Sequence, residues 1–158
     1  MNLLIIMSTI IQSTLTLTSP VFEDGRLIPE EYTCEGRNIN PPLYISNLPD
    51  KTVSMALIME DPDAPGGGLV HWVMYNIPPA TVIKADDAPG VQAANGKGDS
   101  HYTGPCPPTG VHHYHFKIYA LDVKLDLIQN ADKAKVLEKM NGHVLASAEL
   151  IGLYRKEE

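Results

Sequence analysis

The sequence predicts a mainly β fold, a largely antiparallel sandwich with one or two short helices near the C-terminus. Three observations predict it: short apolar or alternating segments, turn-rich segments between them, and a helical pattern only in the last quarter of the chain. The 158 residues are 44% hydrophobic, which suits one ordinary domain with its own core. The 12 Gly and 13 Pro favour many turns over long helices.

The clearest strand signal runs from Val111 to Leu121. Successive side chains of a strand point to opposite faces, so His112 is expected on the apolar face. The apolar face holds Tyr114, Phe116, Ile118 and Ala120, and the opposite face holds His113, His115 and Lys117. Four other segments have strand character: Leu15 to Thr18, Pro42 to Leu48, Val53 to Met59 and Leu69 to Ile77.

The last quarter of the chain carries the helical signal. Asn130 is placed to cap a helix running through Ala131 to Met140, with Gly142 near its end. Residues Ser147 to Tyr154 fit either a last helix or a closing strand.

The N-terminus does not have the pattern of a secretory signal. The first basic residue is Arg26, and the apolar run from Leu3 ends after five residues. No stretch has the length of a membrane span. We therefore expect a cytoplasmic protein with no stable membrane insertion. Residues 1–14 would be an N-terminal extension, an added strand or a disordered tail starting at Met1 or Met7, and residues 15–158 a single domain.

Charge excludes one class of partner. The chain has 12 Lys and Arg against 19 Asp and Glu, a net charge of -7, and no basic run. Nucleic-acid binding by phosphate neutralisation is therefore not expected.

The two cysteines, Cys34 and Cys106, fit neither a disulfide-dense secreted scaffold nor a zinc site with four ligands. A bridge between them would contribute roughly 4 kcal/mol by constraining the unfolded chain. For a reducing cytoplasm, two buried thiols are the favoured interpretation.

A first candidate site begins at Asp61-Pro62-Asp63-Ala64-Pro65, directly after a predicted buried strand. Such a segment is usually a turn, because Asp hydrogen-bonds its own backbone there. His71 favours a site, because it lies in an otherwise apolar segment and needs a buried polar partner. Asp61 or Asp63 could be that partner.

A second candidate site is the stiff loop Tyr102 to Gly110, which leads into His112. Its backbone N–H groups, two imidazoles, an orienting carboxylate and the hydroxyl of Tyr114 or Tyr102 would suit a small anion. The alternative is that both histidines are core residues with satisfied hydrogen bonds.

Other chemistries have weaker support. His113 and His115 share a strand face but lack a third ligand, so no metal is expected. Cys106 could act as a nucleophile with His112 as its base, but it has no helix N-terminus or basic neighbour that would lower the pKa of its thiol. There is no Gly-x-Ser-x-Gly elbow and no phosphate loop. We therefore expect neither a catalytic residue nor a cofactor.

Taken together, these segments resemble the phosphatidylethanolamine-binding protein family, in its prokaryotic branch of Raf-kinase-inhibitor-like proteins. The resemblance spans about residues 15–155. It rests on Asp61-Pro62-Asp63-Ala64-Pro65, His71-Trp72-Val73, Gly104-Pro105-Cys106-Pro107-Pro108, Gly110-Val111-His112-His113-Tyr114 and Tyr119-Ala120-Leu121-Asp122.

The resemblance implies a sandwich of two antiparallel sheets, a closing strand after the helix, and a small anion pocket at one end. It implies a non-enzymatic protein that binds phosphate-like anions, including phosphoethanolamine-type headgroups, and that could regulate a partner kinase or protease. It also allows a homodimer. The ligand-binding residues it implies are Asp61, Asp63, His71, Gly104, Pro105, His112 and Tyr114.

Two alternatives remain open. One is a weak hydrolase that uses His71, His112 and an aspartate as acid and base. The other is a serine protease inhibitor that acts through surface loops. The chain also departs from the family pattern: only five residues separate Pro65 from His71, so the longer basic insertion of eukaryotic members is missing, and His113 stands where an arginine is common.

Overall fold

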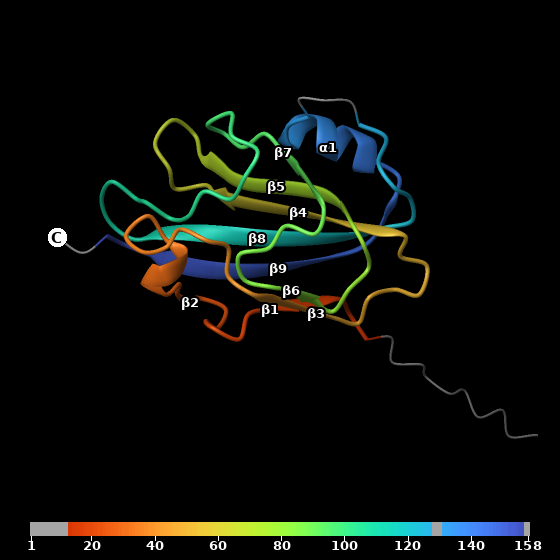
Figure 1. Ribbon diagram of the computed structural model, residues 1–158, viewed down its shortest axis with the longest axis horizontal. Coiled ribbons are helices and arrows are strands. Elements are labelled where there is room, and N and C mark those ends of the chain that lie inside the picture. The colour runs from red at the N-terminus through yellow and green to blue at the C-terminus, as the bar shows by residue number, and fades with distance from the viewer. Residues whose placement is uncertain (1–12, 128–130, 157–158) are drawn as a thin grey trace, which may run out of the picture.

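The computed structural model describes residues 13–127 and 131–156 and confirms a mainly β fold built from two sheets. The larger sheet has six strands in the order β2-β9-β8-β4-β5-β7, and the smaller has three in the order β1-β3-β6 (Figure 1). The larger sheet contains β2 (Arg26–Leu27), β4 (Ser54–Asp61), β5 (Leu69–Ile77), β7 (Val91–Ala93), β8 (His112–Leu121) and β9 (Val144–Tyr154). The smaller contains β1 (Thr16–Thr18), β3 (Leu43–Ser46) and β6 (Val82–Ile83).

One strand pair differs from the expectation of two antiparallel sheets. β2 runs parallel to β9, with Arg26 opposite Gly152 and Leu27 opposite Leu153, whereas the other pairs are antiparallel. A parallel pair requires a long connection between its strands, and here most of the domain lies between the two. The prediction was wrong for this pair because nothing in a two-residue strand marks its partner.

β8 has the predicted alternation. Tyr114, Phe116, Ile118 and Ala120 are fully buried, whereas His113 is exposed and Lys117 half-buried. The buried face joins a core cluster with Leu17 and Ile45 of the smaller sheet, so the main core lies between the two sheets. A second cluster forms on the other face of the larger sheet, where α1 packs with Val136 and Met140 (Figure 1).

The predicted helix is present but starts later than expected. α1 spans Lys133–Met140, and its N-cap is Asp132, whose carboxylate accepts from the N–H of Lys135 at 3.0 Å. The expected cap, Asn130, lies outside the described residues. Ala131 lies before the helix, where its carbonyl accepts from the N–H of Ala94 at 2.8 Å, and Asp132 forms an isolated β-bridge with Ala94.

The ambiguous segment Ser147 to Tyr154 is a strand, part of β9. Gly152 in this strand lets Ile28 pack closely against it, because an added Cβ would come within 2.4 Å of the Ile28 side chain. The short 3-10 helix η1 (Glu30–Tyr32) was not predicted from the sequence.

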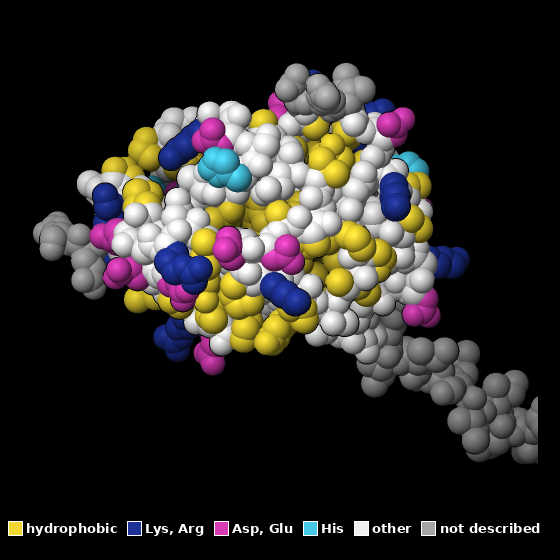
Figure 2. Space-filling model, viewed as in Figure 1, with side chains coloured by type: hydrophobic (Ala, Val, Ile, Leu, Met, Phe, Trp, Pro, Cys, Tyr) yellow, Lys and Arg dark blue, Asp and Glu magenta, His cyan; other side chains and the backbone are white. Residues whose placement is uncertain are grey.

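In the parts of the chain that the structure describes, no helix is long and apolar enough to cross a membrane. On the face seen in Figure 2, Lys and Arg side chains are scattered among Asp and Glu and do not form a basic patch. The expected extension over residues 1–14 falls almost entirely outside the described residues, of which only Ser13 and Thr14 belong to it.

Candidate functional site

Three neighbouring strands of the larger sheet bring the predicted site residues to one end of the molecule. Asp61 is the last residue of β4, His112 is the first residue of β8, and His71 is the third residue of β5. β4 lies between β5 and β8, so both histidines flank the strand that carries the aspartate. Loops after β4 and before β8 complete this end.

Asp61 holds His112. The Nδ1 of His112 donates to Oδ2 of Asp61 at 2.7 Å, and both residues are buried. The other carboxylate oxygen of Asp61 accepts from the N–H of Asp63 at 2.8 Å. The carboxylate therefore fixes the orientation of the imidazole and leaves Nε2 as its remaining polar atom.

His71 has a different partner from the one predicted. Its Nδ1 donates to the backbone carbonyl of Thr103 at 2.6 Å, and neither Asp61 nor Asp63 bonds it. The sequence interpretation was wrong here because a backbone acceptor from a distant loop leaves no sequence signal. Burial lowers the pKa of His71, so the ring is predominantly neutral near neutral pH.

Two polar atoms at this site have no hydrogen-bond partner among the described residues: Nε2 of His71 and the hydroxyl of Tyr114. Both atoms are buried, and the two rings contact edge to face with centroids 5.3 Å apart. Burial also raises the pKa of Tyr114, which keeps the phenol protonated. Buried polar groups are normally paired, so two unpaired groups on touching rings require an explanation.

The loop before β8 is tied to the segment around η1. The N–H of Gly104 donates to Oδ1 of Asn38 at 2.8 Å, and the carbonyl of Pro105 accepts from the N–H of Cys34 at 3.1 Å. A Cβ on Gly104 would come within 2.5 Å of the same Asn38 oxygen. Gly104 and Pro105 therefore shape the loop, and the Gly104 N–H, one of the loop N–H groups considered for ligand binding, already donates within the protein.

The cysteines contradict the prediction of two buried thiols. Cys34 and Cys106 form a disulfide, with Cα atoms 5.4 Å apart, and both residues are exposed. The loop contacts around Gly104 and Pro105 bring the two residues to bonding distance. No free thiol is then left for the Cys106–His112 nucleophile considered above.

The comparisons with known proteins agree with this geometry. A family model described as phosphatidylethanolamine-binding protein matches residues 18–155. The chain belongs to the phosphatidylethanolamine-binding protein family.

Relatives from this family cover nearly the whole chain. The chain is 47% identical over 150 residues to the UPF0098 protein of Methanothermobacter thermautotrophicus, an alignment that covers 90% of this chain and 99% of the relative. It is 44% identical over 148 residues to the UPF0098 protein of Chlamydia muridarum, covering 89% and 99%. The name UPF0098 states no activity.

Solved structures of the family have the same fold. The crystal structure of the putative phosphatidylethanolamine-binding protein homolog CT736 from Chlamydia trachomatis superposes with a TM-score of 0.88 at 41% identity, covering 91% of this chain and 99% of that one. The crystal structure of E. coli YbcL, described as a new member of the mammalian family, gives 0.83 at 32% identity, covering 92% and 100%.

A second acid–histidine pair lies at the rim of the site. Asp63 accepts from both the backbone N–H and the Nδ1 of His113, at 2.8 and 2.6 Å. The hydrogen bonds from His113 lower the pKa of Asp63. Both side chains are about half exposed, so this pair lies outside the buried group formed by Asp61, His71, His112 and Tyr114.

Two tyrosines were candidates for the hydroxyl of the site, and their contacts separate them. The Tyr102 hydroxyl donates to the carbonyl of Tyr32 at 2.7 Å, so its hydrogen is used inside the protein. Tyr114 is the tyrosine with an unpaired hydroxyl at the site.

No pattern in the sequence pointed to the residues that support His71. Asn95 donates to Oγ1 of Thr103 at 3.0 Å, and its Oδ1 accepts from the N–H groups of Lys97 and Asp99. This buried asparagine positions the Thr103 carbonyl that bonds His71. In the sequence, Asn95 is followed by Gly96, and an Asn-Gly pair indicates only a turn.

Among the described residues, no group of three or more metal-ligating side chains comes together. His113 and His115 lie on the same face, as predicted, but His113 bonds Asp63 and His115 lies 3.3 Å from the carboxylate of Glu149.

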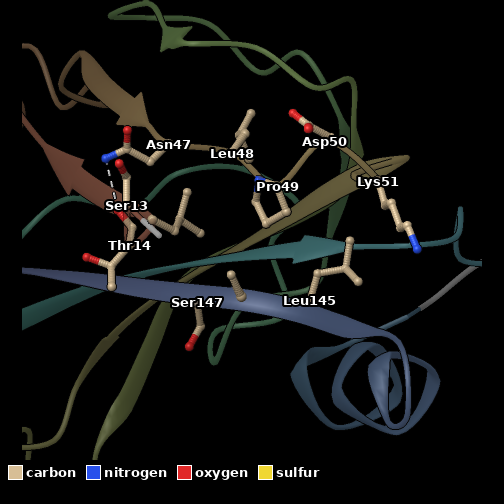
Figure 3. Close-up of a pocket in the computed structure, with 11 residues that line it drawn as sticks. Ser13, Thr14, Asn47, Leu48, Pro49, Asp50, Lys51, Leu145 and Ser147 are labelled. Carbon is tan, nitrogen blue, oxygen red and sulfur yellow. Dashed lines mark hydrogen bonds between the residues drawn. The ribbon is translucent and has the colours of Figure 1, made fainter. Parts of the chain in front are cut away.

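A surface cavity of about 820 Å³ lies far from these side chains. Its lining includes Asn47, Pro49, Leu145 and Ser147 (Figure 3). Ala146, also in the lining, pairs with Ala120 of β8, eight residues along the strand from His112. At about 3.4 Å per residue, the cavity lies roughly 27 Å from the site, at the opposite end of the sheet. We call it the distal groove.

Proposed function

We propose that this protein binds a small phosphate-like anion, such as phosphate or a phosphoethanolamine-type group, in the pocket at the end of β4, β5 and β8. The observation that carries the proposal is the pair of buried, unpaired polar atoms, Nε2 of His71 and the hydroxyl of Tyr114. Leaving both unpaired costs about 1–3 kcal/mol each, and an anion bound between them would remove that cost.

Each side chain then has a role. Tyr114 donates its hydroxyl hydrogen to an anion oxygen, because its raised pKa keeps that hydrogen in place. His112 offers Nε2, and Asp61 holds the imidazole in place through its Nδ1. Gly104 and Pro105 hold the loop that covers the pocket, and Asp63 lies at its rim with His113.

We propose that the protein acts by binding and not by catalysis. The Asp61–His112 pair has the geometry of an oriented general base, but the cysteine closest to it in sequence is held in a disulfide. Turnover assays with generic phosphate and carboxylate esters test the hydrolase alternative. Release above the blank that disappears in His112→Ala would overturn the binding-only proposal.

Family membership makes a protein partner, either a kinase or a protease, and a homodimer reasonable further proposals. If the surface loops alone inhibit a serine protease, inhibition will be unchanged in His71→Ala. Size-exclusion chromatography with light scattering tests the dimer.

The disulfide also bears on location. Exposed disulfides are typical of oxidising compartments and are rare in a reducing cytoplasm, where the sequence had placed the protein. We propose that the bonded form functions in an oxidising compartment. Maleimide labelling of acid-quenched cells tests this, because recovery of two free thiols would favour the cytoplasm.

Thermal unfolding with added phosphate or O-phosphorylethanolamine tests the binding proposal. A ligand at a hundred times its Kd adds about 2.7 kcal/mol, a rise of roughly 5 to 11 °C in Tm for a chain of this size. Tyr114→Phe removes only the unpaired hydroxyl, so most of the rise should be lost.

The matched control is Tyr119→Phe, which removes a hydroxyl from the opposite face of the same strand and should keep the full rise. An equal rise in Tyr114→Phe and wild type would contradict the assignment of this pocket.

A further inference from the structure

The hydrogen positions at His71 are fixed by its contacts. Nδ1 lies 2.6 Å from the Thr103 carbonyl oxygen, and a carbonyl oxygen can only accept. The hydrogen therefore lies on Nδ1. In the neutral ring, Nε2 then carries a lone pair and no hydrogen, so the buried unpaired atom is an acceptor.

The surroundings of His71 favour this neutral ring. Burial lowers its pKa more than the charge of Asp61 and the backbone of Thr103 and Gly104 raise it, and Lys97 of the adjoining loop lowers it further. Asp61 already pairs with His112, and the ring in direct contact from β8 is the protonated phenol of Tyr114.

Tyr114 complements this acceptor. Its hydroxyl has one hydrogen to donate, and its ring packs edge to face on the His71 ring. The pocket therefore presents one acceptor and one donor on touching rings. A ligand that satisfies both carries an O–H and an unprotonated oxygen on the same group.

On the basis of the anion-binding function proposed above, we propose that the pocket selects oxyanions that carry a proton, namely hydrogen phosphate and singly protonated phosphate monoesters, and discriminates against sulfate and phosphate diesters. Sulfate and diesters carry no proton near neutral pH. One of their oxygen lone pairs would face the lone pair of His71 Nε2 in a buried site, and buried polar mismatches of this kind give strong discrimination. An intact phospholipid headgroup is a diester, so this chemistry disfavours it relative to the free phosphoethanolamine monoester.

Isothermal titration calorimetry on the wild-type protein with four probes tests this inference. The probes are inorganic phosphate, sulfate, O-phosphorylethanolamine and glycerophosphorylethanolamine, each measured at about pH 5.5 and about pH 8. Inorganic phosphate keeps at least one proton at both pH values, and we expect it to bind at least about tenfold more tightly than sulfate at both. A phosphomonoester loses its last proton near pH 6. O-phosphorylethanolamine should therefore bind more tightly than sulfate at pH 5.5, and most of that difference in affinity should disappear at pH 8.

The test compares the affinity of each probe with that of sulfate, because sulfate reports any change in charge elsewhere at the site. The affinity of the diester, glycerophosphorylethanolamine, should equal that of sulfate and not that of the monoester. Two variants separate the roles of the rings. Tyr114→Phe should weaken the binding of all four probes while keeping the ratio of phosphate affinity to sulfate affinity. His71→Gln should bring that ratio close to one.

Equal affinity for sulfate and phosphate in the wild type would overturn the inference, since His71 would then be donating from Nε2. A phosphate-to-sulfate ratio that survives His71→Gln would also overturn it. If none of the four probes binds, the proposed anion-binding function fails, and this inference fails with it.

Discussion

The two ends of the larger sheet differ in what they offer a ligand. The distal groove has a volume of about 820 Å³, and polar groups there contact one another, as where Asn47 Nδ2 donates to the Thr14 carbonyl at 3.0 Å (Figure 3). The end with Asp61 and His112 holds the two buried polar atoms that lack partners among the described residues.

This difference shows why volume is a poor guide to function in this fold. Among the described residues, the lining of the distal groove includes no buried polar side-chain atom without a partner, and its charged side chains, Asp50 and Lys51, are exposed to solvent. A buried atom without a partner has a definite free-energy cost, and that cost identifies the kind of atom a ligand must supply. The following predictions test whether the two ends differ in this way.

The largest expected effect comes from the disulfide, which cross-links only the end that holds the candidate pocket. Cys34 and Cys106 are 72 residues apart, so reduction should lower the free energy of unfolding by roughly 4 kcal/mol in the chain-entropy model. Urea unfolding with and without dithiothreitol measures it. The double variant Cys34→Ser, Cys106→Ser serves as control, because its stability should not respond to reductant. A loss below about 1 kcal/mol would show that hydrogen bonds alone hold this loop.

The next effect compares a buried and an exposed acid–histidine pair at the same end. Asp61→Asn should lower the free energy of unfolding by about 2 kcal/mol, because the new amide turns a donor toward either His112 Nδ1 or the Asp63 N–H. Asp63→Asn is the matched control at the exposed pair. Its effect should stay below about 0.5 kcal/mol, because solvent screens that interaction. Chemical denaturation measures both variants, and equal losses would refute the contrast.

A smaller effect is the pH dependence of stability from His71. Burial holds its pKa below the ordinary value of 6.5, so below that pH the unfolded chain takes up a proton that the folded protein does not. Stability from this residue is therefore present above pH 6.5 and is lost as the pH falls, by at most about 1.4 kcal/mol per pH unit. In His71→Gln this component should disappear, so the stability difference from wild type should change between about pH 7 and pH 5.

The control for this pH series is His101→Gln, at an exposed histidine of the neighbouring loop, which should follow the wild-type curve. If His71→Gln also runs parallel to wild type over the whole range, His71 is not titrating as described.

The smallest effect is expected in the distal groove. Leu145 is 38% exposed, so Leu145→Ser should change the free energy of unfolding by less than about 0.5 kcal/mol. Phosphate affinity should be unchanged, because the pocket is roughly 27 Å away along the sheet. Weaker phosphate binding in this variant would mean that the two ends are coupled.

The sequence was sufficient where physical patterns are local. The alternation from His112 to Leu121 placed Tyr114 on the buried face, and the candidate site residues meet at one end because three neighbouring strands carry them there. The sequence was not sufficient where the partner is a backbone atom. His71 bonds the Thr103 carbonyl, which every residue possesses, so no residue type indicated it.

The disulfide was mispredicted for a different reason. Its formation depends on two loops meeting through the Cys34 N–H and the Pro105 carbonyl, whereas the sequence interpretation depended on an assumed reducing compartment. The parallel β2–β9 pair was missed because a two-residue strand has no periodicity to detect.

The same disulfide closes a covalent ring around the middle of the chain. The exposed turn at Gly66 and Gly67 lies inside this ring, between β4 and β5. A protease that cuts the turn would leave β4 on one fragment and β5 on the other, but both fragments would stay joined through Cys34 and Cys106. The cut protein would migrate as one species on a denaturing gel without reductant and as two species with it. Hydrolysis at this turn therefore cannot by itself release either half of the molecule.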